Sequence, residues 1–125
     1  MTRFLAALAT AMLIIPSASG AEASLQIEIA AGSDFERRVT PYTCSDERMF
    51  SVTYINAAPN FLAIVPIAEE PEPLIFAAVI SASGVRYAAG QWTWWSQGVD
   101  ASLYDATLGD DAEPVLTCTE INNTP

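Results

Sequence analysis

The sequence predicts an all-β fold, a small antiparallel barrel of seven or eight strands, and three observations lead to it. Short apolar or alternating segments recur about every ten residues and are separated by turn residues. No segment after residue 21 keeps the 3.6-residue period of an amphipathic helix. Strands of this length build either a sandwich or a closed barrel. Two cysteines, on the first and last core strands, favour the barrel.

The first 21 residues are predicted to be a secretory signal peptide, outside the fold. Met1–Arg3 carries one positive charge, Phe4–Ile15 is apolar at all but one position, and Pro16–Ala21 is rich in small residues. The apolar run is too short to span a bilayer. We expect cleavage after Ala21, with the bond one residue earlier as the near alternative. Because no cysteine directly follows the cut, we expect no lipid attachment.

The exported chain is strongly acidic. The sequence has 5 basic and 15 acidic side chains and no histidine, and its basic residues are all arginines. The leader holds one charged residue, Arg3, so the formal charge of the remainder is 4 − 15 = −11. This field repels nucleic acid and anionic membranes and speeds association with a basic partner. Acidity also keeps a small exported protein soluble, and both explanations hold together.

These features predict a periplasmic protein without a membrane anchor or a nucleic-acid partner. We expect a monomer or a weak dimer. The exported part divides into an N-terminal arm at residues 22–38, a barrel at residues 39–120 and a tail at residues 121–125. Within the arm, Leu25–Ile29 alternates and is either an extra edge strand or a loose arm.

The strands of the barrel are predicted from alternation, β-branched residues and flanking turn signals. Gly84 and Gly90 bracket one short strand, and Glu69–Pro73 is too rich in proline and charge for a strand interior. The first strand begins near Val39. The others are Met49–Ile55, Phe61–Ile67, Leu74–Ile80, a segment centred on Tyr87, Gln91–Ser96, Ala101–Tyr104 and Val115–Thr119.

Cys44 and Cys118 are predicted to form a disulfide. Export places them in an oxidising compartment, and they are the two cysteines of the chain. The bridge would close a loop of about 75 residues and contribute roughly 4 kcal/mol in the chain-entropy model. Two thiols without histidine are too few ligands for a metal site, so we expect no metal and no cofactor.

The chain lacks the residues that most enzyme mechanisms require. The chain has no histidine for general-base chemistry and no lysine for a Schiff base, and both thiols are expected to be oxidised. Carboxylates are numerous, so a two-carboxylate glycosidase stays formally open. One acidic cluster could be interpreted as a calcium-binding loop, but it lacks the D-x-D-x-D-G spacing. Acidic turn residues on a solvated rim explain it better. The cluster comprises Asp105, Asp110, Asp111 and Glu113.

The segment Ser81–Gly98 holds all three tryptophans between two glycine turns. In a strand, Trp92 and Trp94 face one side and Trp95 the other, so at least one indole points away from the core. Packing in the core or against a loop is the ordinary fate of a tryptophan. The Ser83-Gly84 and Gln97-Gly98 turns should be exposed because their side chains are short or polar.

This segment carries a resemblance. Ser83-Gly84-Val85-Arg86-Tyr87 is similar to the S-G-x-x-Y motif of the MliC/PliC family of C-type lysozyme inhibitors. Trp94-Trp95-Ser96-Gln97-Gly98 resembles the family's second motif, a tryptophan followed by lysine-glycine. Like segments extend from about residue 39 to 120 and include both cysteines. The resemblance implies an eight-stranded antiparallel barrel and the soluble periplasmic branch of the family.

The resemblance also implies a site and a partner. The partner is C-type lysozyme, a basic protein with a catalytic glutamate and aspartate in its cleft. The two turns would enter that cleft: Ser83 would hydrogen-bond the glutamate, and the family's lysine would pair with the aspartate. Gly84 and Gly98 belong to the turns. Tyr87 and the indoles of Trp92, Trp94 and Trp95 would hold the loops rigid.

The sequence departs from the family at position 97, where glutamine replaces lysine. Gln97 donates only as a neutral amide, which at a desolvated site could cost a few kcal/mol. Arg86 either compensates by reaching the cleft or is a rim residue bonded to a local carboxylate. The leading hypothesis is a lysozyme inhibitor, not an enzyme. The alternative is a non-inhibitory binding module for another basic protein or an envelope glycan.

Overall fold

The computed structural model describes residues 10–12, 24, 26–28 and 35–121. The predicted cleavage site and the tail beyond residue 121 lie outside the described residues. Of the predicted Leu25–Ile29 segment, residues 26–28 are described and belong to no strand. The described elements are β1 (Glu36–Cys44), β2 (Met49–Ala57), β3 (Asn60–Val65), β4 (Leu74–Val79), β5 (Val85–Ala89), β6 (Trp92–Gln97), β7 (Asp100–Asp105), the 3₁₀ helix η1 (Ala106–Leu108) and β8 (Leu116–Glu120).

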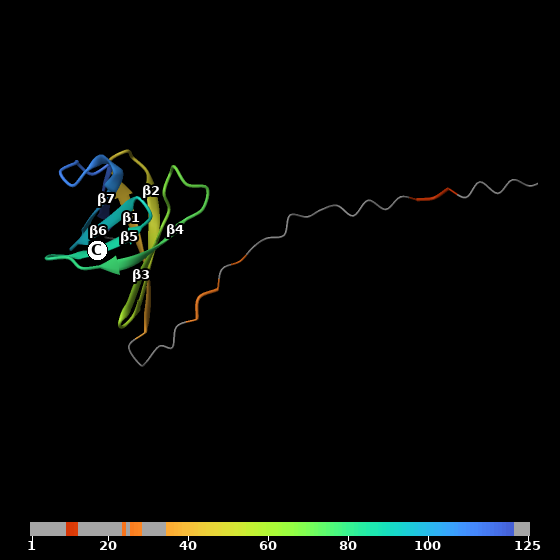
Figure 1. The fold of residues 1–125 in the computed structure, drawn as a ribbon, viewed down its shortest axis with the longest axis horizontal. Helices are drawn as coiled ribbons and strands as arrows, with labels where there is room; N and C mark the ends of the chain where they lie inside the picture. Colours follow the sequence, from red (N-terminus) through yellow and green to blue (C-terminus); the bar gives the residue numbers. More distant parts are fainter. Residues whose placement is uncertain (1–9, 13–23, 25, 29–34, 122–125) are drawn as a thin grey trace, which may run out of the picture.

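The eight strands form one closed antiparallel barrel in sequence order, β1 to β8, which confirms the predicted fold class. Each strand pairs with its neighbours in the chain, and β8 returns to pair with β1. Figure 1 shows the strands gathered into one body, with β1 to β7 labelled. Closure removes free sheet edges between these strands. No helix among the described residues has the length and apolar character needed to cross a membrane.

The strand boundaries differ from the predicted ones by a few residues. The first strand begins at Glu36, so three residues of the predicted arm belong to β1 and pair with β2. The connection between the predicted strands Met49–Ile55 and Phe61–Ile67 shortens to Ala58 and Pro59, because β2 runs to Ala57 and β3 starts at Asn60. Inter-strand hydrogen bonds extend strands beyond the residues whose side-chain pattern marks them.

The barrel interior is the hydrophobic core. Along β2 the buried side chains alternate, with Val52 and Tyr54 inside, as the sequence pattern predicts. On β6 the indoles of Trp92 and Trp94 point inward, while Trp95 lies on the outer face and is half-buried. The core cluster comprises Tyr42, Cys44, Val52, Tyr54, Ala63, Val65, Ile67, Phe76, Tyr87, Trp92, Trp94, Ala101, Leu103, Leu116 and Cys118.

Polar groups in this core satisfy one another. The Trp94 indole Nε1 donates to the Tyr54 hydroxyl at 2.9 Å. The hydroxyls of Tyr54 and Tyr42 share a hydrogen bond of 2.6 Å. The Tyr42 ring also packs edge-on against Trp94, with ring centroids 5.4 Å apart. A connected network leaves little penalty for burying three polar side chains and fixes the register of β1, β2 and β6.

Buried tyrosines predict a loss of stability in alkali. Burial raises the pKa of the Tyr42 hydroxyl, as does its hydrogen bond with Tyr54, and burial also raises the pKa of Tyr87 above its ordinary value of 10.0. Above pH 10 the unfolded chain therefore releases protons that the folded chain keeps. Stability is intact below that pH and falls by about 1.4 kcal/mol per pH unit for each such tyrosine above it.

Guanidinium unfolding between about pH 8 and pH 11 measures this effect. The expected result is a falling midpoint only in the alkaline part of the range, with a smaller fall in Tyr87→Phe, which cannot ionise. A midpoint that stays constant to pH 11 would contradict the assignment.

Candidate functional site

Two turns lie side by side at one end of the barrel. In the β5–β6 hairpin, Val85 pairs with Ser96, so the start of β5 and the end of β6 share that end. The turn before β5 (residues 81–84, the Ser83 turn) therefore meets the last residue of β6 and the turn that follows it (residues 97–99, the Gln97 turn). Ser83 and Gln97 are both exposed, as predicted, and the fold brings the two predicted motifs together.

Hydrogen bonds tie the two turns to each other. The Gln97 side-chain Nε2 donates to Ser83 Oγ at 3.1 Å. The Trp95 indole Nε1 donates to the Ser83 carbonyl oxygen at 2.9 Å, and the Ser81 hydroxyl donates to the same oxygen at 2.6 Å. Ser83 is therefore held through both its backbone and its side chain.

Gly84 permits this close approach. Its φ of +63° lies in the left-handed region, which favours glycine. A Cβ at this position would collide with the Ser96 carbonyl oxygen and lie 2.6 Å from Gln97 Cγ. Gly98 also has a positive φ, +60°, but a Cβ there would meet nothing within 4 Å. Gly84 is thus needed for both conformation and space, and Gly98 for conformation alone.

Arg86 stacks on the outer indole. Its guanidinium carbon lies 3.9 Å from the centroid of the Trp95 ring, in cation–π geometry. Arg86 Nε is buried without a hydrogen-bond partner, and within the described residues Arg86 forms no ion pair. The predicted alternative of a rim arginine bonded to a local carboxylate is therefore not observed. The contact, worth about 0.5–2 kcal/mol, steadies the indole that holds Ser83.

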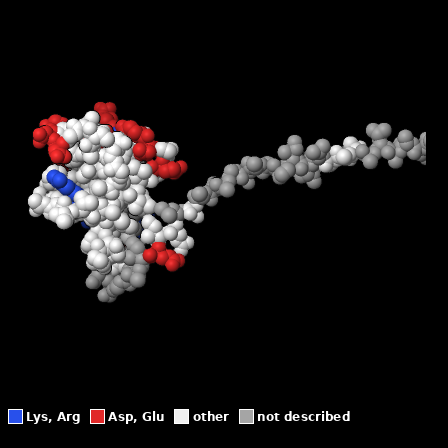
Figure 2. All heavy atoms as spheres, in the orientation of Figure 1, with Lys and Arg blue, Asp and Glu red and all other residues white. Residues whose placement is uncertain are grey.

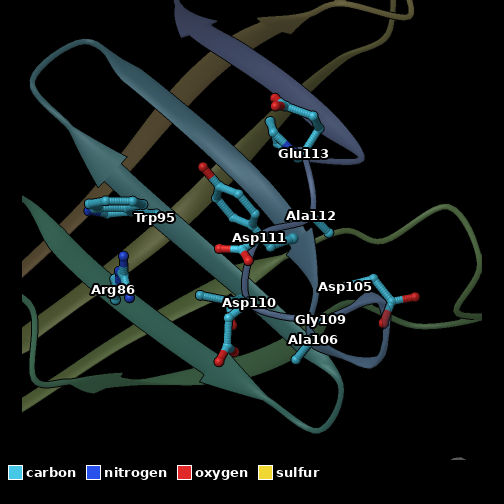
Figure 3. Close-up of a pocket in the computed structure, with 12 residues that line it drawn as sticks. Arg86, Trp95, Asp105, Ala106, Gly109, Asp110, Asp111, Ala112 and Glu113 are labelled. Carbon is cyan, nitrogen blue, oxygen red and sulfur yellow. The ribbon is translucent and has the colours of Figure 1, made fainter.

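A cleft of about 370 Å³ opens on the outer face of β5, β6 and β7. Figure 3 shows Arg86 and Trp95 stacked on one side of it, with Asp110 and Asp111 across from them on the loop that follows η1. Tyr104 lines the cleft too, its ring centroid 6.3 Å from that of Trp95. In Figure 2, acidic side chains gather along one edge of the face shown.

The acidic cluster forms part of the rim of this cleft. Asp105 caps η1: its Oδ1 accepts hydrogen bonds from the Thr107 amide and hydroxyl, at 2.9 and 2.6 Å. These bonds lower the pKa of Asp105. Asp110, Asp111 and Glu113 are exposed around the rim. In the part of the chain that the structure describes, no three potential ligands gather around one point.

The remaining predicted aromatics lie inside the barrel. Tyr87 and Trp94 are cross-strand partners in the core, and Trp94 is fully buried. Trp92 lies at the opposite end of β6 from the turns, where its Nε1 is 3.4 Å from Glu70 Oε1. Within residues 35–121, Trp95 is the indole that bonds the Ser83 turn directly. The others support the turns through the core.

Sequence reasoning missed two features of this site. Tyr104 joins it because Thr93 pairs with Tyr104 and Trp95 with Ser102, a register that no local pattern reveals. The capping role of Asp105 had a usable signal, since an Asp two residues before a Thr favours a local side-chain turn.

A closed, disulfide-linked barrel that presents two fixed turns at one end has the architecture of a small binding protein. The sequence profile of the MliC family, described as membrane-bound lysozyme-inhibitor of c-type lysozyme, matches residues 42–111. This chain belongs to that family, which confirms the resemblance found in the sequence.

Two curated relatives carry the name membrane-bound lysozyme inhibitor of C-type lysozyme. The protein from Pseudomonas aeruginosa is 37% identical over 94 residues, which cover 75% of this chain and 73% of the relative. The protein from Cupriavidus necator is 34% identical over 101 residues, 78% of this chain and 79% of the relative. A crystal structure of Pseudomonas aeruginosa MliC in complex with hen egg white lysozyme matches with a TM-score of 0.64 at 37% identity, covering 80% of this chain and 99% of that one.

Proposed function

We propose that this chain inhibits C-type lysozyme by inserting the Ser83 and Gln97 turns into the active-site cleft of the enzyme. The observation that carries the proposal is the pairing of the two turns. Both family motifs meet at one exposed end of a barrel whose relative forms a complex with hen egg white lysozyme. A rigid, pre-formed loop pair loses little entropy on binding.

The chemistry of the turns fits a cleft that contains carboxyl groups. The Ser83 hydroxyl accepts from Gln97 and keeps its own hydrogen for an outside acceptor. A hydrogen bond to a charged group contributes about 1.5–3 kcal/mol. The acidic side chains around the neighbouring cleft would guide a basic enzyme towards the turns.

The inhibitor acts by blocking a site and is not itself an enzyme. It lacks histidine and lysine, and the polar side chains at the two turns are serine and glutamine. We further propose that it works in the bacterial periplasm, exported by residues 1–21 and free of a lipid anchor, although its relatives are named membrane-bound. Mass measurement of the protein from a periplasmic extract would locate the cleavage, expected after Ala21.

A cell-wall lysis assay tests the inhibitory function. The full-length chain is expressed with its own leader, purified from the periplasm and titrated against hen egg white lysozyme, beside Ser83→Ala and Ser51→Ala. Ser51 is an exposed serine on β2 and serves as the matched control. Wild type and Ser51→Ala are expected to inhibit, and Ser83→Ala to bind about 10- to 150-fold more weakly.

Gln97→Lys completes the assay because it restores the family residue. If wild type is inert and Gln97→Lys inhibits, the turns have inhibitor geometry but the glutamine has redirected the protein to another partner. If both are inert, inhibition of C-type lysozyme is refuted for this chain. The same samples incubated with peptidoglycan fragments then test the glycan-binding alternative.

A further inference from the structure

We propose that Gln97 is a positioning residue for Ser83: its amide orients the Ser83 hydroxyl, and Gln97 contributes to lysozyme binding through that serine. This inference rests on the proposed function and explains how a neutral glutamine serves where the family has lysine. It assigns Gln97 a role different from direct pairing with a carboxylate of the enzyme.

The first step is the state of Ser83 before any partner arrives. Its carbonyl oxygen already accepts from Trp95 Nε1 and Ser81 Oγ, so the backbone is fixed. Its side-chain oxygen accepts from Gln97 Nε2. A serine hydroxyl has one hydrogen to donate and two lone pairs to accept with. Because the Gln97 amide occupies one lone pair of Ser83 Oγ, the hydroxyl hydrogen points away from Gln97, towards solvent.

The second step concerns the polarity of the pair. An amide that donates to a hydroxyl polarises its O–H bond and strengthens the next hydrogen bond in the chain. In the chain of hydrogen bonds from the Gln97 amide to the Ser83 hydroxyl and on to a lysozyme carboxylate, each group therefore donates to the next. Gln97 needs no charge for this task, which removes the difficulty raised by the missing lysine.

The third step is the placement of Gln97 itself. A Cβ on Gly84 would lie only 2.6 Å from Gln97 Cγ. The Gln97 side chain therefore packs closely over the Ser83 turn. Gln97 follows Trp95 on the outer face of β6, two residues further along. The amide is thus directed across the gap between the turns, and its Nε2 reaches Ser83 Oγ.

A double-mutant cycle tests the inference, with lysozyme dissociation constants measured by calorimetry on the protein exported from the full-length chain. Gln97→Met keeps Cγ and the packing on Gly84 but removes the amide. It is expected to weaken binding about 3- to 10-fold when Ser83 is present, and less than 2-fold in the Ser83→Ala background. Equal effects in both backgrounds would mean that Gln97 contacts the enzyme independently, and would overturn the inference.

Two charged variants test the direction of the hydrogen bond between Gln97 and Ser83. Lysine donates and cannot accept, so Gln97→Lys is expected to keep the dependence on Ser83. Glutamate only accepts, so Gln97→Glu draws the Ser83 hydrogen inward, and mutating Ser83 should then change binding by less than 2-fold. The reverse pattern would overturn the proposed orientation.

The contact between Gln97 and Ser83 can also be tested in the free protein. The side-chain amide resonances of Gln97 are expected to shift in Ser83→Ala while the unfolding midpoint stays unchanged. Unchanged resonances would refute the contact. If wild-type protein does not bind lysozyme at all, the proposed function fails together with this inference. If it binds and the cycle is additive, only the inference fails.

Discussion

Gly84→Ala is expected to separate the two turns and to lower the free energy of unfolding by about 2 to 5 kcal/mol. A non-glycine residue at a φ of +63° costs about 1–2 kcal/mol. The new methyl group collides with the Ser96 carbonyl oxygen and crowds Gln97 Cγ, and such overpacking costs about 1–3 kcal/mol more. The two turns should move apart in addition to losing the Gln97–Ser83 hydrogen bond, so lysozyme binding falls by at least about tenfold.

Gly90→Ala is the matched control for this change. Gly90 lies at the other end of the β5–β6 hairpin, has a φ of +54°, and has nothing within 4 Å of the Cβ position. It is expected to lose about 1–2 kcal/mol from backbone strain and to keep its affinity for lysozyme. Thermal unfolding and calorimetry on both variants decide the matter. Indistinguishable melting temperatures and affinities would show that the turns adapt to a methyl group.

The contrast between these glycines marks what the sequence could predict. Gly84 and Gly90 were both recognised as turn residues, because glycine between strand patterns is a local signal. The difference between them is not local. It depends on β6 lying beside the Ser83 turn, which brings a carbonyl oxygen and a glutamine side chain against one glycine and leaves the other open.

The strands themselves were predictable because their signals are short-range. Alternation placed Val52 and Tyr54 on one face of their strand and divided the indoles between two faces, and in the structure the face with Val52 and Tyr54 is buried. The strand boundaries were not predictable in this way, since Glu36 joins β1 through pairing with Asn56, not through its side chain. Pairing extends a strand that composition alone would end.

The candidate site was predicted residue by residue, but its internal contacts were not. The motifs indicated Ser83, Gln97 and Arg86 as separate contributors. Their arrangement depends on the register of β5 on β6, which sets Arg86 opposite Trp95 and brings Gln97 to Ser83. Arg86 consequently stacks on an indole instead of bonding a carboxylate. Side-chain partners across strands require a register, and the sequence pattern does not supply one.

Loss of the disulfide is expected to cost about 4 kcal/mol, a large part of the roughly 5–15 kcal/mol that stabilises a typical domain. Cys44 and Cys118 are bonded and are direct cross-strand partners in β1 and β8, 74 residues apart in sequence. The double variant Cys44→Ala/Cys118→Ala removes the bridge without burying unpaired hydroxyls, which serine would introduce at these buried positions. Guanidinium unfolding with and without a reducing agent measures the loss.

Loss of the disulfide should also weaken the end of the barrel that carries the Ser83 and Gln97 turns, because β8 connects the bridge to that end. The Glu120 amide donates to the Val99 carbonyl oxygen at 2.8 Å, and the Thr119 hydroxyl donates to Asp100 Oδ1 at 3.1 Å. The Gln97 turn is therefore attached to the strand that the disulfide anchors. Reduced wild type and the double variant are expected to bind lysozyme more weakly even where they stay folded, with faster hydrogen exchange at Glu120. If affinity and exchange are unchanged, the three β1–β8 residue pairs hold β8 in place without the bridge.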